Sequence, residues 1–374
     1  MIIKDRLVEL TRDLIRINSE NPTGNEAMIA DFVGRRLRDA GLKVKTHEFK
    51  DKRVNVVSRL NGRLKKTVLI SPHLDTVPAG SNWKYGAFKA QIFNGKIYGR
   101  GASDCKCNLA IAIEALVSLK EDNIKPGCDV LLAATADEEA GSKYGLIPLL
   151  KRKIINPDYA VILDSEELNI ITTQKGLMHF KVSVPGKSAH GAYPGRGINA
   201  IELSSAIILD LKRYKFKYTK NPLLKGPTIN IGTICGGEKV NMVADFCSFS
   251  VDLRYLPGMK KRPIINAVSK IVKNHSRGAR IEFSDMQEPY SISKSHPLVK
   301  NFVGALKKEK IASKIKGSEG ATVITFFQDR NIPAISFGCS SSGCAHSTNE
   351  YVKIDNLLKG ARVLERFLKN FGGA

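Results

Sequence analysis

Histidine and carboxylate side chains follow short apolar runs of this chain, at the points where strands would end. His73 and Asp75 follow the run TVLIS, Glu138 and Glu139 follow DVLLAAT, and Asp164 follows YAVIL directly. The carboxyl ends of parallel strands meet at one edge of a sheet, where open α/β folds bind their ligands. We therefore expect these side chains to lie close together and to do chemistry there.

Two further residues of the same types can join them. His346 follows the run PAISFG after a Ser/Gly-rich loop, and Asp104 precedes a helix expected at 108–120. A single histidine is more often structural than a ligand, and a pair of acids is more often a solvated turn. Imidazole and carboxylate groups delivered from several strand ends, however, form an oxygen and nitrogen site that suits zinc or a similar divalent cation.

Alternating strands and helices must position these residues. Ile3, Leu7, Leu10 and Leu14 recur at the spacing of one helix face, and strand-like and helical runs then alternate up to about residue 176. This alternation predicts the α/β class, with a mostly parallel sheet that carries the candidate site.

The pattern changes from about Met178. The expected elements there follow the order β-α-β-β-α-β, which is typical of a ferredoxin-like unit, and helix–strand alternation resumes after about Glu288. We predict a main domain in two parts, 1–176 and 288–374, interrupted by a small inserted α/β domain at 177–287.

The composition excludes several classes of protein. The 374 residues include 59 Lys+Arg and 36 Asp+Glu, a net charge of +23, with 43% hydrophobic residues, as in globular proteins. The sequence has no apolar run long enough to predict a membrane span, and its beginning does not resemble a secretory signal. Seven scattered cysteines argue against a disulfide framework, so we expect a reduced, cytoplasmic protein.

The excess positive charge is interpreted as a lysine-rich, solvated surface. Zinc-finger, RNP and basic-zipper signatures are absent from the sequence, so we expect neither nucleic acid nor a membrane as a partner. A P-loop is excluded because Lys181 stands where GKS would need a glycine. The run GCSSSG does not fit a serine-hydrolase elbow. The alternative from another class is a non-catalytic basic scaffold, or a nucleic-acid binder, that has kept the fold.

Five ordered motifs resemble a known family of di-zinc hydrolases. They are HLDTVP, GRGASDCK, ADEEAGS, the aspartate after YAVIL, and AHSTNEYV. The family includes acetylornithine deacetylase, succinyl-diaminopimelate desuccinylase, aminoacylase and glutamate carboxypeptidase, and the resemblance covers nearly the whole chain. It implies a di-metal domain with an inserted dimerisation domain, and hence a homodimer. The implied activity is hydrolysis of the amide bond of N-acyl amino or diamino acids, with a carboxypeptidase- or dipeptidase-like exopeptidase as the alternative.

The resemblance also implies the ligands of two zinc ions. Cobalt or manganese can take the place of zinc. Asp104 resembles the carboxylate that bridges the two metals. His73 and Asp164 would complete one metal site, and Glu139 and His346 would complete the other. The Asp104–Cys105 peptide bond is expected to be cis, as the family suggests.

Other matching positions imply catalytic and substrate-binding roles. Asp75 would hydrogen-bond the His73 ring and orient it. Glu138 would be the general base, and His190, in SAHGAYPG, would donate a hydrogen bond to the oxyanion in the site of a partner subunit. Substrate contacts are implied at four further positions, Asn241, Arg254, Gly320 and Thr322. Cys107, Val323 and Thr325 depart from the family pattern, which leaves the acyl group and the amino acid of the substrate open.

Overall fold

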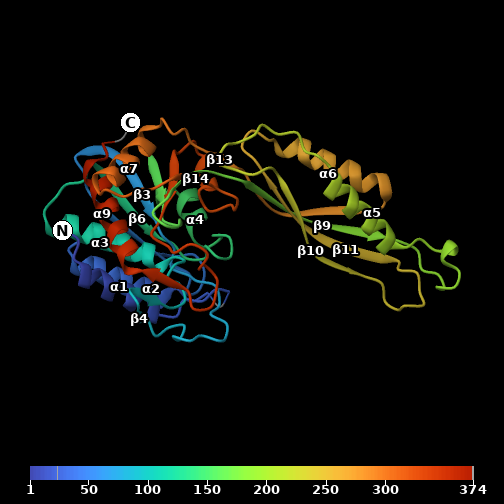
Figure 1. The fold of residues 1–374 in the computed structure, drawn as a ribbon, viewed down its shortest axis with the longest axis horizontal. Helices are drawn as coiled ribbons and strands as arrows, with labels where there is room; N and C mark the ends of the chain where they lie inside the picture. Colours follow the sequence, from blue (N-terminus) through green and yellow to red (C-terminus); the bar gives the residue numbers. More distant parts are fainter. Residues whose placement is uncertain (23, 373–374) are drawn as a thin grey trace. The chain divides into compact units, whose positions relative to one another are not determined.

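The computed structural model describes residues 1–22 and 24–372. These divide into two compact units, of which the first contains both the blue beginning and the red end of the chain (Figure 1). The first unit comprises Met1–Thr172, Ile292–Lys316 and Thr322–Ala374, and the second comprises Thr173–Ser291 and Gly317–Ala321. The main unit is thus discontinuous. Its junctions lie near 172 and 292 instead of 176 and 288, and the short 317–321 segment was not expected.

The first unit is built on a mixed sheet in the order β1-β2-β6-β3-β7-β15-β8. Its strands are β1 (Lys43–Glu48), β2 (Val54–Leu60), β3 (Leu64–Ser71), β6 (Cys128–Ala134), β7 (Tyr159–Ile162), β8 (Ile170–Gln174) and β15 (Ala334–Phe337). The pairs β6/β3, β3/β7 and β7/β15 are parallel, whereas the outer pairs are antiparallel. The predicted α/β class with a largely parallel central sheet is therefore confirmed. The antiparallel strands at the edges of the sheet were not predicted.

Shorter strands complete the sheet structure. Two of them pair with β8, namely β13 (Tyr290–Ser291) and β14 (Ile315–Ser318). A separate small sheet has the order β16-β5-β4 and consists of β4 (Gln91–Phe93), β5 (Lys96–Tyr98) and β16 (Tyr351–Lys353). This small sheet joins a segment before Asp104 to one after His346.

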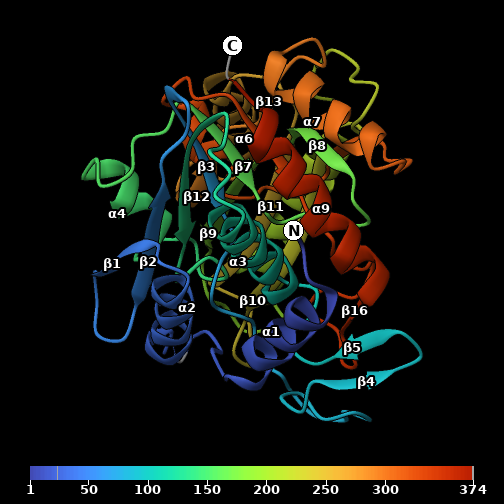
Figure 2. The same ribbon diagram turned by 90° about the vertical axis from the view of Figure 1, so that its left-hand side faces the viewer.

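Helices of the first unit cover the sheet and bury its core. They are α1 (Lys4–Arg16), α2 (Ala27–Asp39), α3 (Lys106–Glu121), α4 (Leu146–Lys151), α7 (Pro297–Lys308), α8 (Thr325–Gln328) and α9 (Ile354–Asn370). Helices α1, α3 and α9 lie side by side (Figure 2). The expected opening helix is present, with Leu7, Leu10 and Leu14 buried on one face.

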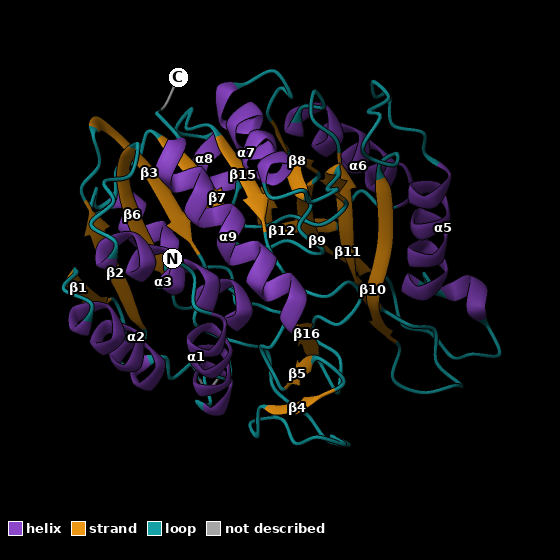
Figure 3. Cartoon of the chain, turned by 60° about the vertical axis from the view of Figure 1, so that its left-hand side comes forward, coloured by secondary structure: helices purple, strands orange, loops and turns teal. Residues whose placement is uncertain are grey.

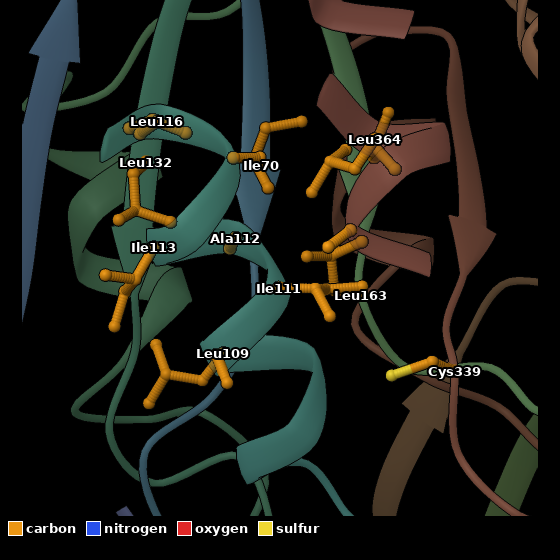
Figure 4. Close-up of a cluster of buried hydrophobic side chains, with 14 of the residues drawn as sticks. Ile70, Leu109, Ile111, Ala112, Ile113, Leu116, Leu132, Leu163, Cys339 and Leu364 are labelled. Carbon is orange, nitrogen blue, oxygen red and sulfur yellow. The ribbon is translucent and has the colours of Figure 1, made fainter. Parts of the chain in front are cut away.

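Helix α3 is buried on nearly every side, which explains why its apolar residues show no single stripe. Figure 4 shows its side chains in one cluster with Ile70 of β3, Leu132 of β6 and Leu364 of α9. The helix begins directly after the Asp104–Cys105 bond, which is cis. A rigid, buried helix therefore holds the loop that carries Asp104.

Helix α7 contributes an aromatic side chain to the core of the first unit. Its Phe302 is fully buried, and the ring centroid lies 4.7 Å from those of Phe337 and Phe367. We expect Phe302→Ala to lower the free energy of unfolding by about 3–5 kcal/mol, because it leaves a cavity in a packed core. Denaturant unfolding followed by circular dichroism measures this. Lys300→Ala, on the exposed face of α7, is the control that should change it little.

The second unit has the predicted ferredoxin-like order. Its elements are β9 (Gly176–Pro185), α5 (Ala200–Arg213), β10 (Thr228–Gly236), β11 (Phe246–Tyr255), α6 (Lys261–His275) and β12 (Arg280–Gln287), with a short 3-10 helix η1 (Pro194–Arg196). The sheet order is β10-β11-β9-β12, and every pair is antiparallel. The side chain of Asn199 caps α5 by accepting a hydrogen bond from Ile201 N.

Among the helices of residues 1–22 and 24–372, none combines the length and the apolar character needed to cross a membrane.

Candidate metal centre

Neighbouring parallel strands deliver the candidate ligands to one edge of the first unit's sheet. Strands β6, β3, β7 and β15 are adjacent (Figure 3). His73 follows β3, Glu138 and Glu139 follow β6, and Asp164 follows β7. His346 lies in the loop after β15. Its backbone φ of 61° is in the left-handed region, which residues other than glycine seldom adopt. The expected convergence at the strand ends is present.

The carboxylate of Asp104 lies between two imidazole rings. Its Oδ1 is 3.0 Å from Nε2 of His73, and its Oδ2 is 3.2 Å from Nε2 of His346. Nε2 of His346 is also 3.2 Å from Oε2 of Glu139. Each oxygen of Asp104 thus faces a different histidine, which is the arrangement that a bridging carboxylate requires.

Two overlapping groups of donor atoms result. In each group the ligand atoms lie within 4.8 Å of one another, and Asp104 is common to both. The groups are His73, Asp104 and Asp164, and Asp104, Glu139 and His346. The mixture of imidazole nitrogen and carboxylate oxygen is the donor chemistry that zinc accepts, so the residues fit a pair of divalent cations.

Asp75 is fully buried and contacts both the His73 ring and the backbone of the two glutamates. Nδ1 of His73 is 3.5 Å from its Oδ1 and 3.0 Å from its carbonyl oxygen. The backbone N–H groups of Glu138 and Glu139 each donate to its carboxylate at 3.0 Å, and Asn21 donates at 2.8 Å. Burial raises the pKa of Asp75, but hydrogen bonds from His73 and Asn21 outweigh it and lower the pKa. Asp75 therefore stays ionised and holds the His73 ring and the two glutamates in place.

The cluster concentrates negative charge in a buried space. Burial and the neighbouring Asp104 carboxylate raise the pKa of Asp164 to about 7. Burial and the charges of Asp164 and Glu139 raise the pKa of Glu138 well above its usual range. Hydrogen bonds to Asp104 and Glu139 raise the pKa of His346 to about 10. Carboxylates crowded in this way attract cations, and a bound divalent ion would reverse these shifts.

The candidate residues of the second unit form a separate arrangement. His190 and Met242 form an isolated β-bridge, and Gly191 N donates to the carbonyl of Asn241 at 2.7 Å. Ala192 N donates to Nδ1 of His190 at 3.0 Å, so the neutral ring carries its proton on Nε2. Two of the expected residues thus lie on adjoining loops.

The other three predicted substrate contacts do not lie on the loops of His190 and Asn241. They are Arg254, Gly320 and Thr322. Arg254 projects from β11, and its Nε and Nη2 donate to Asp252 at 2.7 and 3.0 Å. Sequence reasoning missed this ion pair, which occupies one side of the guanidinium. Gly320 belongs to the short segment of the second unit, where Ser318 Oγ accepts from its N–H at 3.2 Å. Thr322 belongs to the first unit, before α8.

Sequence reasoning also missed three buried residues around the centre, Asn21, Arg100 and Glu350. Asn21 supports Asp75, as described above. Glu350 accepts hydrogen bonds from the loop that carries Asp104, and Arg100 pairs with Glu350. Arg100 and Glu350 lie inside the motifs GRGASDCK and AHSTNEYV, so nearness to a ligand in the sequence was the available signal.

This fold and this set of donor atoms define a metal-dependent hydrolase that acts on amide or peptide bonds. Residues 69–370 match the model of peptidase family M20/M25/M40, and the chain belongs to that family.

Individual relatives agree with this membership. An uncharacterized metallohydrolase of Methanocaldococcus jannaschii is 28% identical, over 99% of this chain and 100% of that protein. An acetylornithine deacetylase of Aliivibrio salmonicida is 28% identical, over 96% of this chain and 95% of its own length. The crystal structure of the aminopeptidase PepT from Bacillus cereus superimposes with a TM-score of 0.83 at 22% identity, covering 98% of both chains. The last similarity shows the fold alone.

Proposed function

We propose that this enzyme uses two zinc ions to hydrolyse the amide bond of N-acyl amino or diamino acids. The observation that carries the proposal is the Asp104 carboxylate, whose two oxygens face His73 and His346 at 3.0 and 3.2 Å. His73, Asp104 and Asp164 would hold one ion, and Asp104, Glu139 and His346 the other. The similarity to acetylornithine deacetylase along nearly the whole chain favours small N-acyl substrates.

Glu138 is the proposed general base. It is the neighbour of Glu139 but belongs to neither group of ligand atoms. When bound, paired divalent cations acidify a water molecule and polarise an amide carbonyl. Glu138 takes a proton from the attacking water and delivers it to the leaving nitrogen, and the second proton of the water also ends on that nitrogen, so that the amide and water become a carboxylate and an ammonium. Because Glu138 is not one of the ligands, its carboxylate stays free to accept a proton and then return it.

The proposal is tested by steady-state rates on succinyl-diaminopimelate, acetylornithine and an N-acyl glutamate, with dipeptides as the comparison. We expect at least one N-acyl substrate to be preferred, and a chelator to abolish the activity until zinc is restored. Preference for a dipeptide would favour the exopeptidase alternative instead. Hydrolysis that survives complete metal removal would reject the metal-dependent mechanism.

We also propose that His190 donates a hydrogen bond to the developing oxyanion, across a homodimer. The support is its exposed ring and the Nε2 proton fixed by Ala192. His190→Ala should lower kcat about a hundredfold, as the loss of one oxyanion donor does. Steady-state kinetics measure this. His275→Ala is the control, because His275 pairs with Asp210 on the surface; a normal kcat for His190→Ala would reject the role.

The proposed homodimer forms through the second unit. β10 is an edge strand of its sheet, and an unpaired edge invites another strand. Ile234 on β10 and Val240 beyond it are exposed apolar residues. Sedimentation should give a dimer; a fully active monomer would remove the role of His190 across the interface.

We propose contacts to the substrate at Asn241, Arg254, Gly320 and Thr322. Arg254 would bind a substrate carboxylate through the N–H groups that do not contact Asp252. Arg254→Lys should raise KM because an ammonium cannot bind both oxygens in parallel.

A cytoplasmic location is proposed as well, in agreement with seven free cysteines.

A further inference from the structure

Glu350 is a fully buried glutamate that lies outside both groups of ligand atoms. It directly precedes β16, and β16 pairs antiparallel with β5, with Tyr351 opposite Tyr98. This register brings Glu350 beside the segment that follows β5, where Gly99 N donates to its carbonyl at 2.9 Å. The small sheet therefore carries Glu350 to the loop that ends at Asp104.

The Glu350 carboxylate accepts hydrogen bonds from four donors. Its Oε1 accepts from the backbone N–H groups of Ser103 at 2.7 Å and Asp104 at 2.8 Å. Its Oε2 accepts from Arg100 Nη1 at 2.6 Å and Gly101 N at 3.1 Å. One side chain thus fixes the backbone of the loop up to and including the bridging residue.

Arg100 extends the connection to the other ligand loops. Its side chain is almost fully buried, and its Nη1 donates to the carbonyl of Ser347 at 3.2 Å. Its Nη2 donates to the carbonyls of Pro78 at 3.2 Å and His346 at 3.5 Å. The Pro78 loop follows His73 and Asp75, and the Ser347 carbonyl adjoins His346. The guanidinium therefore joins the loops of three ligands in a fixed planar fork.

We propose that Glu350 and Arg100 act as a positioning pair that holds Asp104, His346 and the His73 loop in the geometry for two cations. The inference rests on the proposed metal centre. A bridging carboxylate must present both oxygens at once, so a small displacement of its loop weakens both sites. Groups that orient metal ligands without touching the metal typically contribute about 10–100-fold to affinity or activity.

Glu350→Gln tests the pair sharply. Glutamine has nearly the same shape, but one carboxylate oxygen is replaced by an NH₂ group. That NH₂ must face either the Ser103 and Asp104 N–H groups or Arg100 and Gly101, so donors oppose donors in both orientations. We expect the zinc dissociation constant, measured by competition with a chelating dye in the absence of substrate, to rise about 10–100-fold.

Glu114→Gln is the matched control. Glu114 is equally buried, on α3, and its carboxylate accepts from Ile3 N at 2.9 Å and Arg6 Nε at 2.8 Å. Both variants should lower the melting temperature, but Glu114→Gln should bind zinc within about twofold of the wild type, because Glu114 does not hold a ligand loop. Folded Glu350→Gln with unchanged zinc affinity would overturn the positioning role.

Arg100→Lys provides a second route if Glu350→Gln does not fold. Lysine keeps the charge but cannot span the carbonyls of several loops, so zinc affinity should fall about tenfold. Trp83 reports on the pair, since it is the only tryptophan and its ring centre lies 5.3 Å from the Arg100 guanidinium. Its emission should change in Arg100→Lys but not in Glu114→Gln, and unchanged emission and affinity in Arg100→Lys would also reject the proposal.

These readouts are independent of the substrate. A wild-type enzyme that fails to hydrolyse N-acyl amino acids would reject the proposed activity and leave the comparison of zinc affinities intact. A wild-type enzyme that binds no zinc would reject the metal centre itself.

Discussion

Glu138→Gln should keep its bound metal and lose amide hydrolysis by about 10²–10⁴-fold, the usual contribution of a positioned general base. The carboxylate of Glu138 lies outside both groups of ligand atoms, so it is free to accept a proton. The amide of glutamine has a similar shape but cannot accept the proton of water. The measurements are kcat on the best N-acyl substrate and metal content by mass spectrometry on the same sample.

Glu139→Gln is the natural contrast, because it changes the adjacent residue in the same way. Its side chain faces His346, so this variant should lose metal as well as activity. Both glutamates hydrogen-bond Asp75 through their backbone, and neither substitution removes that support. A Glu138→Gln protein with wild-type kcat would refute the base assignment, and one that loses metal would make Glu138 a ligand.

Asp104→Ala should prevent tight binding at both metal sites, whereas His346→Ala should lose only one of them. The reason is geometric: Asp104 belongs to both groups of donor atoms, and His346 belongs to one. Activity should fall to the background rate in Asp104→Ala, since both cations and the shared ligand are lost. Metal content after dialysis, together with the rate of hydrolysis, distinguishes the two variants.

His296→Ala is the control for the loss of a histidine. His296 caps α7 by accepting from Leu298 N at 3.1 Å and belongs to neither donor group, so its loss should leave metal content unchanged. Equal metal loss in Asp104→Ala and His346→Ala would show that the bridging assignment is wrong. Loss of a ligand shared by two ions must remove more metal than loss of a ligand to one ion.

The strand-end positions could be predicted because local sequence and topology point to the same edge. His73, Glu139 and Asp164 each follow a short apolar run, and the rule for parallel strands then brings them together without any knowledge of side-chain contacts. The same reasoning found the β-α-β-β-α-β order of the inserted unit. His346 was included on the same grounds, although a Ser/Gly-rich loop separates it from β15.

Other features depend on pairings that a linear pattern does not record. Glu350 is buried because β16 pairs with β5, strands of three residues each that lie far apart in the sequence. Asp252 engages Arg254 two residues away on β11, although alternation along a strand predicts only that both face the same side. Phe302 lies next to a lysine-rich stretch, and its burial depends on contacts with Phe337 and Phe367.

The position of β15 in the sheet has a consequence for how the chain acquires its structure during synthesis. β15 lies between β7 and β8, although residues 173–291 are made between them and β15. On the ribosome, the inserted unit therefore emerges and can fold while the larger sheet still lacks an interior strand. His346 and Glu350 emerge later still. The metal centre thus becomes complete only near the end of translation. An incomplete chain ending before β15 would contain the donor group of His73, Asp104 and Asp164 but would lack His346 and Glu350.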